Sequence, residues 1–490
     1  MQKIKLEREM KITHDCGGAF TLPDYVPAIG RMLSAECTPA PEGVYLKEAE
    51  GRGIQAELGG IATFRILYVP EESETGGIYG VTVPCDYDTA VMIGAASGPV
   101  VCRTSTTPEN VICRVTAPRK LQLRCRLGTK ITVAAETEPD SPEDITAGME
   151  VKRGDAMAMA VWSAEARDLL CALDLSGLPE GAAPVSCSAS VNVTECKPAS
   201  QGEYRCRGDV IVHCIYHAGE TVGTYHDRVP FDELVMFDGD APGEGASARA
   251  FGRIDSAELH HDDSGSHVEV IYDLGVEAAA TVPTCIIYDA YSCTSPCAVG
   301  YDDIEYLSPL CCVTGNVSVN ERVPKNVTGR VCAVTAHAVM MDANSDRGRL
   351  RLSGELRGNV LISTDGELDV IPFSVPWSYE LPVSSDCGGA PAVWGDVSVI
   401  SAAARIDGEL AIDAELSVSV TAAETRRERV VSSAVAEGEA FPARDGFTVY
   451  YPSQGETVWD IAKHFHVPTA AVACDGNVTA DGAPAAVVVV

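Results

Sequence analysis

One arrangement of apolar runs recurs three times along the chain at a fixed interval, and this repeat constrains the fold more than any other feature. Its anchors are Val83-Pro84, Val229-Pro230 and Val375-Pro376. Each anchor begins 146 residues after the one before it, since 229 − 83 and 375 − 229 are both 146. An interval of this length is typical of one domain, so we expect three tandem copies of one module in this chain of 490 residues.

The residues around each anchor have the pattern of half-buried strands. Apolar runs precede the anchors at 64–69, 210–216 and 359–362, and Asp365-Gly366 after the third run is typical of a two-residue hairpin turn. After the anchors, apolar side chains occupy every second position: Leu121, Leu123, Cys125 and Leu127; Val268, Val270 and Tyr272; Leu416, Val418 and Val420. Such strands have one buried and one solvated face, which predicts a mainly β fold of three antiparallel, sandwich-like modules.

Composition shifts suggest the domain boundaries. We expect modules at 1–140, 141–284 and 285–424, a polar, Ala-rich linker at 425–446 and a small domain at 447–490. The Ala- and Met-rich stretch 156–175 is a candidate helix between the first two modules.

The charge balance excludes some classes of partner. The chain has 37 basic and 70 acidic side chains and a net charge of −33, which repels nucleic acid and anionic lipid. No window of about 18 apolar residues occurs, so membrane insertion is not expected. The first twelve residues lack the apolar core of a secretion signal, and we therefore expect a cytoplasmic location.

Nineteen cysteines are spread thinly along the chain. In a cytosolic protein such residues are expected to be reduced and to pack as small hydrophobic side chains. This interpretation covers Cys113, Cys125, Cys206 and Cys214, which lie inside apolar alternations.

The last 44 residues have a pattern of their own. Thr457 is a candidate helix N-cap, with Asp460 three residues later to complete a capping box. A second helix is expected at 469–474, after Pro468. The valine-rich end, 485–490, is expected to pair as a strand with 448–451, which gives a βααβ unit.

This segment resembles the LysM family, because Gly455 to Lys463 read Gly-Glu-Thr-Val-Trp-Asp-Ile-Ala-Lys in the order of the family motif. The resemblance implies a binding patch, and Trp459 is expected to share its ring between the core and that patch. Most LysM modules bind N-acetylglucosamine chains of peptidoglycan, and some bind protein. The candidate partner- or glycan-binding residues are Tyr450, Tyr451, Gly455, Glu456, Thr457, Trp459, Asp460, Lys463, His464 and Phe465.

Two further motifs resemble the SPOCS family (domain of unknown function 3794) of spore coat proteins. They are Leu-Pro-Asp-Tyr-Val-Pro-Ala-Ile at 22–29 and Asp-Ala-Tyr-Ser at 289–292. Tandem SPOCS modules followed by one LysM domain imply a scaffold in spore coat assembly, at the forespore surface in the mother cell. Its LysM domain would dock onto the coat morphogenetic ATPase, stage IV sporulation protein A, and its SPOCS modules would bridge other coat proteins. The alternative is a cell-wall protein that binds peptidoglycan.

Reactive chemistry is not expected. His260-His261-Asp262-Asp263 with His267 could supply zinc ligands, but the corresponding place in the third copy is a hairpin turn, which favours a lengthened loop. Cys293 and Cys297 lack a second pair at zinc-finger spacing. No P-loop, His-Glu-x-x-His or Gly-x-Ser-x-Gly motif occurs. We therefore predict no catalytic residues, no metal and no cofactor.

Overall fold

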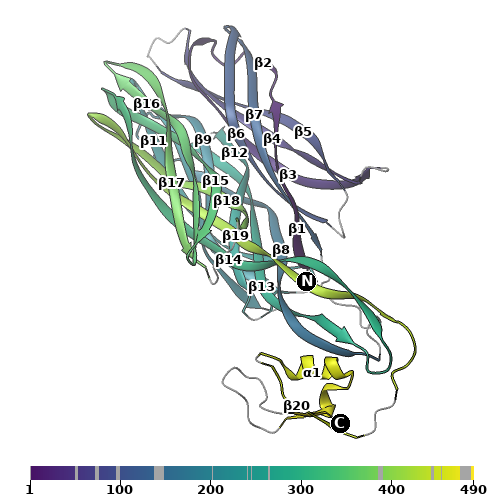
Figure 1. Ribbon diagram of the computed structural model, residues 1–490. Coiled ribbons are helices and arrows are strands. Elements are labelled where there is room, and N and C mark those ends of the chain that lie inside the picture. Colours follow the sequence, from purple (N-terminus) through teal and green to yellow (C-terminus); the bar gives the residue numbers. More distant parts are fainter. Residues whose placement is uncertain are drawn as a thin grey trace. The chain divides into compact units, whose positions relative to one another are not determined.

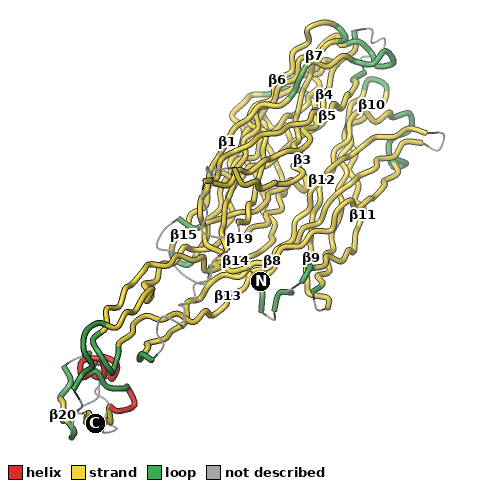
Figure 2. The backbone as a smooth tube through the Cα atoms, turned by 90° about the vertical axis from the view of Figure 1, so that its right-hand side faces the viewer, coloured by secondary structure: helices red, strands yellow, loops and turns green. Residues whose placement is uncertain are grey.

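A computed structural model describes most of the chain and is mainly β (Figure 1). The described residues are 2–49, 53–71, 77–94, 100–136, 148–200, 202–239, 241–243, 245–262, 265–383, 390–442, 446–453, 455–474 and 487–489. Within them lies one α-helix, α1 (Val458–Phe465), and helical residues are drawn in red in Figure 2. No helix in this described part is long and apolar enough to cross a membrane.

The chain forms two compact units. Unit 1 comprises Met1–Glu136, Met159–Ala280 and Pro309–Glu424, and unit 2 comprises Thr137–Ala158, Thr281–Ser308 and Thr425–Val490. Four long strands contribute residues to both units: β8 (Glu150–Asp174), β13 (Gly265–Tyr291), β14 (Cys297–Asn326) and β19 (Glu409–Ala436). The units thus combine pieces from distant parts of the sequence, and the sequential module boundaries stay a prediction.

The same order of strands occurs three times. Each copy has a three-stranded antiparallel meander, and the three meanders are β3 (Ile29–Ala49), β4 (Gly53–Pro70) and β5 (Tyr79–Gly94); β9 (Ala183–Ser200), β10 (Glu203–Ala218) and β11 (Thr221–Met236); β15 (Arg330–Asp346), β16 (Arg349–Thr364) and β17 (Glu367–Pro382). Each copy also has a hairpin, namely β6 (Val100–Ala117) with β7 (Lys120–Glu136), β12 (Ser247–Asp262) with β13, and β18 (Ala392–Asp407) with β19. The second hairpin strand pairs with the first strand of its copy, β1 (Gln2–Cys16), β8 or β14, and β2 (Ala19–Thr21) also pairs with β7. The prediction of a mainly β, antiparallel fold is confirmed.

The anchor prolines lie on the outer strand of each meander. Pro84 on β5 is opposite Thr63, Pro230 on β11 is opposite Asp209, and Pro376 on β17 is opposite Glu355. Proline has no N–H to give to a sheet and is therefore confined to edge strands or bulges. The strand register repeats with the same interval as the sequence.

The alternating residues line the interior as expected. The apolar members on β7, β13 and β19 are all buried, and Cys125, Leu416 and Val418 are fully enclosed. Asp365 and Gly366 have φ angles of 50° and 86° at the turn between β16 and β17. The predicted hairpin and its buried faces are therefore confirmed.

Two local expectations are wrong. The stretch 156–175 is not a helix, because residues up to Asp174 belong to strand β8, and Val161 and Ala160 pair with Gln2 and Lys3 of β1. Pairing with neighbouring strands outweighs the helix propensity of alanine and methionine. The expected linker begins as strand, since β19 continues to Ala436 and packs Val430 and Val431 into the core of unit 2.

One pair of cysteines is oxidised, so the expectation of reduced thiols is wrong for Cys187 and Cys214. They form a disulfide between β9 and β10, where they are direct partners in the ladder with Cα atoms 4.3 Å apart. Fifteen other cysteines of the described part are free, and Cys113, Cys125 and Cys206 are among them.

A buried ion cluster joins strands of all three copies in unit 1. The Glu277 carboxylate on β13 accepts hydrogen bonds from Arg103 Nε at 2.7 Å, Arg249 Nε at 3.3 Å and Trp394 Nε1 at 2.8 Å, and from the hydroxyl of Thr421. Burial alone would raise the pKa of Glu277, but the two guanidinium groups outweigh it and lower the pKa to about 2. Glu277 therefore stays ionised inside the core.

The C-terminal segment forms a small three-stranded sheet in unit 2, with the strand order β20 (Thr448–Tyr450), β22 (Val487–Val489) and β21 (Val472–Cys474). We call residues 447–489 the C-terminal module. The predicted pairing of its first and last strands is confirmed. The predicted second helix at 469–474 is wrong, because one 3-10 turn at Thr469–Ala471 leads directly into β21, which gains ladder hydrogen bonds from β22.

Candidate binding surface of the C-terminal module

The start of α1 is fixed by the expected capping box. The Thr457 hydroxyl accepts a hydrogen bond from the Asp460 backbone N–H at 3.4 Å, and the Thr457 N–H donates to Asp460 Oδ2 at 2.9 Å. The hydrogen bonds from Thr457 lower the pKa of Asp460. Gly455, just upstream, has a φ angle of 84°, which suits glycine at this turn. Thr457 and Asp460 therefore set where the helix begins.

Trp459 and Lys463 lie one turn apart on α1 and meet the same carboxylate. Trp459 Nε1 donates to Asp289 Oδ2 at 2.9 Å, and Lys463 Nζ lies 2.7 Å from both oxygens of Asp289. The Tyr301 hydroxyl donates to Asp289 Oδ1 at 2.6 Å. Asp289 is on β13 and Tyr301 on β14, so strands of unit 2 receive this face of the helix.

The charge at this contact is stable. Burial would raise the pKa of Asp289, and the hydrogen bonds from Lys463, Tyr301 and Trp459 more than offset that effect, so its pKa lies below the ordinary value. The Asp289 carboxylate is therefore ionised at neutral pH and forms an ion pair with Lys463.

Aromatic and polar contacts complete the anchored face. The ring of Tyr291 packs edge-on against Trp459 with centroids 4.9 Å apart, and its hydroxyl donates to the Val467 carbonyl at 2.8 Å. The Thr469 hydroxyl donates to Glu150 at 3.1 Å. The face that includes Trp459 and Lys463 is thus already bound to the strands of unit 2.

Three other expected site residues, Tyr450, Glu456 and Phe465, make contacts within the module. The Tyr450 hydroxyl donates to Glu456 Oε2 at 3.0 Å, and the Tyr450 ring packs edge-on against Phe465 with centroids 5.3 Å apart. Phe465 packs against the buried core of the module, while His464 beside it is exposed. His464 therefore lies at the surface of the module.

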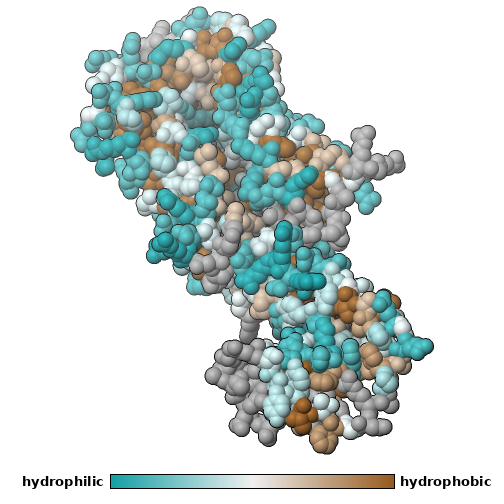
Figure 3. Space-filling view, in the orientation of Figure 1, coloured by the Kyte–Doolittle hydropathy of each residue, from teal (hydrophilic) through white to brown (hydrophobic). Residues whose placement is uncertain are grey.

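A strip of apolar side chains at the other side of the module is exposed. Phe447, Val449 and Tyr451 alternate along β20 and its ends, and they are 71%, 50% and 75% exposed. Hydrophobic residues of this module are visible at the lower edge of Figure 3. β20 is an outer strand of the three-stranded sheet, paired only with β22 among the described strands. We call Phe447, Val449 and Tyr451 the β20 strip.

Sequence reasoning found Tyr451 but missed the rest of this surface. Phe447 and Val449 could have been found from the alternation 447, 449, 451, which places three apolar side chains on one face of a strand. Asp289 was noted as part of a family motif, but nothing in the sequence showed that it meets Trp459 and Lys463.

The histidine cluster does not assemble a metal site from the residues that the structure describes. The rings of His260 and His267 stack with centroids 5.3 Å apart across the β12–β13 hairpin, and His261 Nδ1 lies 2.8 Å from the Ser266 hydroxyl. The Asp262 side chain and Asp263 lie outside the described residues. One group of three potential ligands does come together elsewhere in the described part: Cys16, Cys37 and Cys125.

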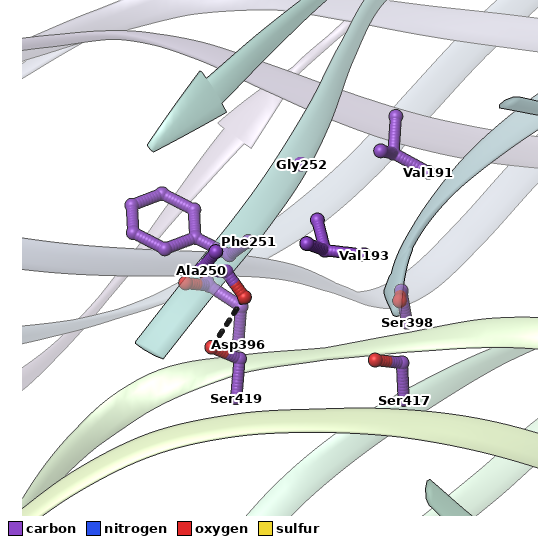
Figure 4. Close-up of a pocket in the computed structure, with 9 residues that line it drawn as sticks. All are labelled: Val191, Val193, Ala250, Phe251, Gly252, Asp396, Ser398, Ser417 and Ser419. Atoms are coloured by element: carbon purple, nitrogen blue, oxygen red, sulfur yellow. Dashed lines mark hydrogen bonds between the residues drawn. The ribbon is translucent and has the colours of Figure 1, made fainter. Parts of the chain in front are cut away.

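A small cavity in unit 1 is too small for an ordinary ligand. Its volume is about 20 Å³, whereas small-molecule sites usually enclose about 300–1,000 Å³. Figure 4 shows Val191 and Val193 on one side and Ser417 and Ser419 on the other, with the Ser419 hydroxyl donating to the Ala250 carbonyl at 2.9 Å. The space can hold one water molecule.

Comparisons with models of known protein families, with curated proteins and with solved structures found no match to this chain.

Proposed function

We propose that this chain is a non-enzymatic scaffold in spore coat assembly, and that its C-terminal module binds a protein partner through the β20 strip. The observation that carries the proposal is the exposure of Phe447, Val449 and Tyr451 on one face of an outer strand. Exposed apolar side chains that gather on a small module mark interaction sites, and aromatic residues dominate the free energy of binding at such sites.

The outer strand favours protein as the ligand. An exposed strand edge can accept an extended segment of a partner through backbone hydrogen bonds, and the side chains along it then give specificity. The face of the module that carries Lys463 is anchored to β13 by Asp289. A partner bound at β20 would therefore be connected through the module to the strands of unit 2. A tether needs both a binding surface and such an anchor.

The resemblance to SPOCS and LysM proteins suggests which partner this is. We infer that the β20 strip docks onto the coat morphogenetic ATPase, stage IV sporulation protein A, and that the three repeated modules bridge other coat proteins. A partner that covers a surface in many copies raises the effective concentration of each further contact, so that modest affinities suffice for stable attachment. Tethering at the forespore surface of the mother cell is the resulting mechanism.

The test uses the full-length chain, because the module depends on Asp289 of β13. Tyr451→Ala should weaken binding to the purified ATPase about 10- to 100-fold, as expected for an aromatic residue at the centre of an interface. Tyr25→Ala is the matched control, since Tyr25 is 85% exposed and lies in unit 1. Surface-immobilised ATPase and a titration of each variant would give the two affinities. Equal binding by both variants would move the contact away from β20.

The cell-wall alternative is tested with the same proteins. The purified chain is mixed with insoluble peptidoglycan and centrifuged, and the ATPase is offered in parallel. A scaffold of the proposed kind stays in the supernatant and binds the ATPase. Pelleting with the glycan without affinity for the ATPase would replace the proposal by a glycan-binding function.

A further inference from the structure

Three thiols from three strands meet in the core of the first copy. Cys16 ends β1, Cys37 lies on β3 and Cys125 lies on β7, and their sulfur atoms are all within 4.8 Å of one another. The three residues are 7%, 6% and 0% exposed. Cys16 and Cys125 are direct partners in the β1–β7 ladder, while Cys37 comes from the separate β3-β4-β5 sheet. The cluster therefore lies where the two sheets of this copy face each other.

An imidazole lies on the same strand as Cys16, and its nitrogens are outside the group of ligand atoms that lie within 4.8 Å of one another. His14 precedes Cys16 by two residues on β1, so both side chains point to the same face of the strand. Both ring nitrogens of His14 are buried and have no hydrogen-bond partner among the described residues. Its ring packs against Tyr87 with centroids 5.4 Å apart. A buried polar group without a partner is costly in a core built mostly of apolar side chains.

We propose that Cys16, Cys37 and Cys125 bind one thiophilic d10 metal ion, Zn²⁺ or Cu⁺, and that His14 supplies the fourth ligand when the ion is Zn²⁺. Thiolate sulfur is the ligand that selects these ions, and three cysteines with one histidine form a standard structural zinc site. Each thiol releases its proton to solvent as its sulfur binds the ion, and no electron is transferred.

The sulfur–sulfur distances suit such an ion, and the His14 ring would turn toward it to supply the fourth ligand. A zinc–sulfur bond of about 2.3 Å separates the sulfur atoms of a regular site by about 3.8–4.0 Å. The thiols, within 4.8 Å of one another, need to approach by less than about 1 Å, which small changes of side-chain torsion provide. All three cysteines are buried, which suits a structural rather than a catalytic ion. Such an ion would link β1, β3 and β7 across both sheets.

The experiment measures metal retained by the full-length chain. Protein purified with a thiol reductant is loaded with Zn²⁺, or with Cu⁺ under ascorbate, desalted and analysed for metal and protein. We expect about one ion per chain for the natural sequence, and less than about 0.1 for Cys16→Ser, Cys37→Ser and Cys125→Ser. Cys206→Ser is the matched control, because Cys206 is fully buried and its sulfur lies 3.8 Å from that of Cys196. This control should retain the ion.

Two further measurements keep the test decisive. Co²⁺ titration of the natural chain should produce a thiolate-to-cobalt charge-transfer band, a readout that needs no variant to fold. His14→Ala should lower Zn²⁺ retention at least about 10-fold and leave Cu⁺ retention unchanged, because Cu⁺ is satisfied by three thiolates. A natural chain that retains no metal and gives no cobalt band would overturn the proposal. Retention that survives all three serine substitutions would do the same.

Discussion

Two of the carboxylates on strand β13, Glu277 and Asp289, are ionised in different surroundings. Glu277 lies in unit 1 with its side chain 4% exposed, and two arginines, a tryptophan and a threonine contact it. Asp289 lies in unit 2 with its side chain 20% exposed and is contacted by a lysine, a tryptophan and a tyrosine. Both have a lowered pKa although burial alone would raise it. Hydrogen-bond donors and cations decide the charge state at both sites.

The two sites differ in whether water can solvate the basic side chain once its carboxylate is neutralised. If Glu277 loses its charge, Arg249, which is 4% exposed, keeps a buried positive charge whose remaining carboxylate partner is Asp396 at 3.6 Å. If Asp289 loses its charge, Lys463, which is 39% exposed, can turn toward water. The same kind of contact therefore holds a core together in one region and acts as an adjustable anchor in the other.

The largest expected effect is that of Glu277→Gln. This change leaves Arg103 without the Glu277 carboxylate and Arg249 with only Asp396, at 3.6 Å, and it should lower the free energy of unfolding by about 3–5 kcal/mol. Urea denaturation followed by tryptophan fluorescence measures it, because Trp394 contacts Glu277 directly. Glu57→Gln, in the exposed pair with Lys47, is the control and should cost less than about 0.5 kcal/mol. Equal losses in the two variants would contradict the role of burial.

The pH dependence of the free energy of unfolding should differ between the natural chain and Glu277→Gln. The pKa of Glu277 is about 2 in the folded chain and 4.5 as the ordinary value, so the unfolded chain binds the proton first as the pH falls. Its contribution is fully present above pH 4.5 and is lost toward pH 2, with a total of about 3 kcal/mol. Unfolding curves at several pH values should show the natural chain and Glu277→Gln converging in acid. A constant gap down to pH 2.5 would contradict the assignment.

A smaller effect is expected for Asp289→Asn. Removing the charge that Lys463 and Trp459 contact should weaken the anchoring of α1 by about 1–2 kcal/mol. Hydrogen exchange of the α1 amides should then accelerate about 10-fold, since 1.4 kcal/mol corresponds to a factor of ten. Asp303→Asn, at an exposed position of β14, is the control. The charge reversal Asp289→Lys with Lys463→Asp should restore part of the protection, and failure to do so would reduce the contact to packing alone.

The smallest effect belongs to Thr457→Ala. It removes the N-cap oxygen of α1 without touching Asp289 and should destabilise the helix by about 1 kcal/mol. Exchange should increase at the first turn of α1, while Thr457→Ser should keep the natural protection. Faster exchange over the whole module in both Thr457→Ala and Asp289→Asn would mean that the contributions of the cap and of the Asp289 contact cannot be separated.

Local patterns predicted much of the fold. The 146-residue interval and the alternation around Leu121 and Val418 gave the repeated antiparallel sheets, because burial on one face imposes a period of two. The prediction of a helix at 156–175 was wrong because alanine and methionine suit a helix as well as a buried strand. Pairing with β1, which the local sequence does not show, decides for the strand. The Cys187–Cys214 disulfide was not predicted, because it depends on the register between β9 and β10.

The candidate sites were harder to predict because their members come from distant strands. The capping box of Thr457 and Asp460 is local and was predicted, whereas the contact between Asp289 and Lys463 spans 174 residues. One long-range signal was available: Arg249 follows Arg103 by the repeat interval, since 249 − 103 is 146. The third copy has Gly395 there, where a Cβ atom would lie 2.2 Å from the Ser419 carbonyl oxygen. Two arginines at equivalent positions thus contact one glutamate, and the third copy has a glycine, without a side chain, at that position.

The recurring Val-Pro step affects how copies of this chain can associate through their outer strands. An unpaired strand border is a template onto which another chain can add, and β5, β11 and β17 are each one of the two outer strands of a described meander. A missing amide hydrogen at Pro84, Pro230 and Pro376 interrupts the row of donors that a stacking neighbour would need. These prolines therefore make backbone pairing of another chain with β5, β11 or β17 less favourable.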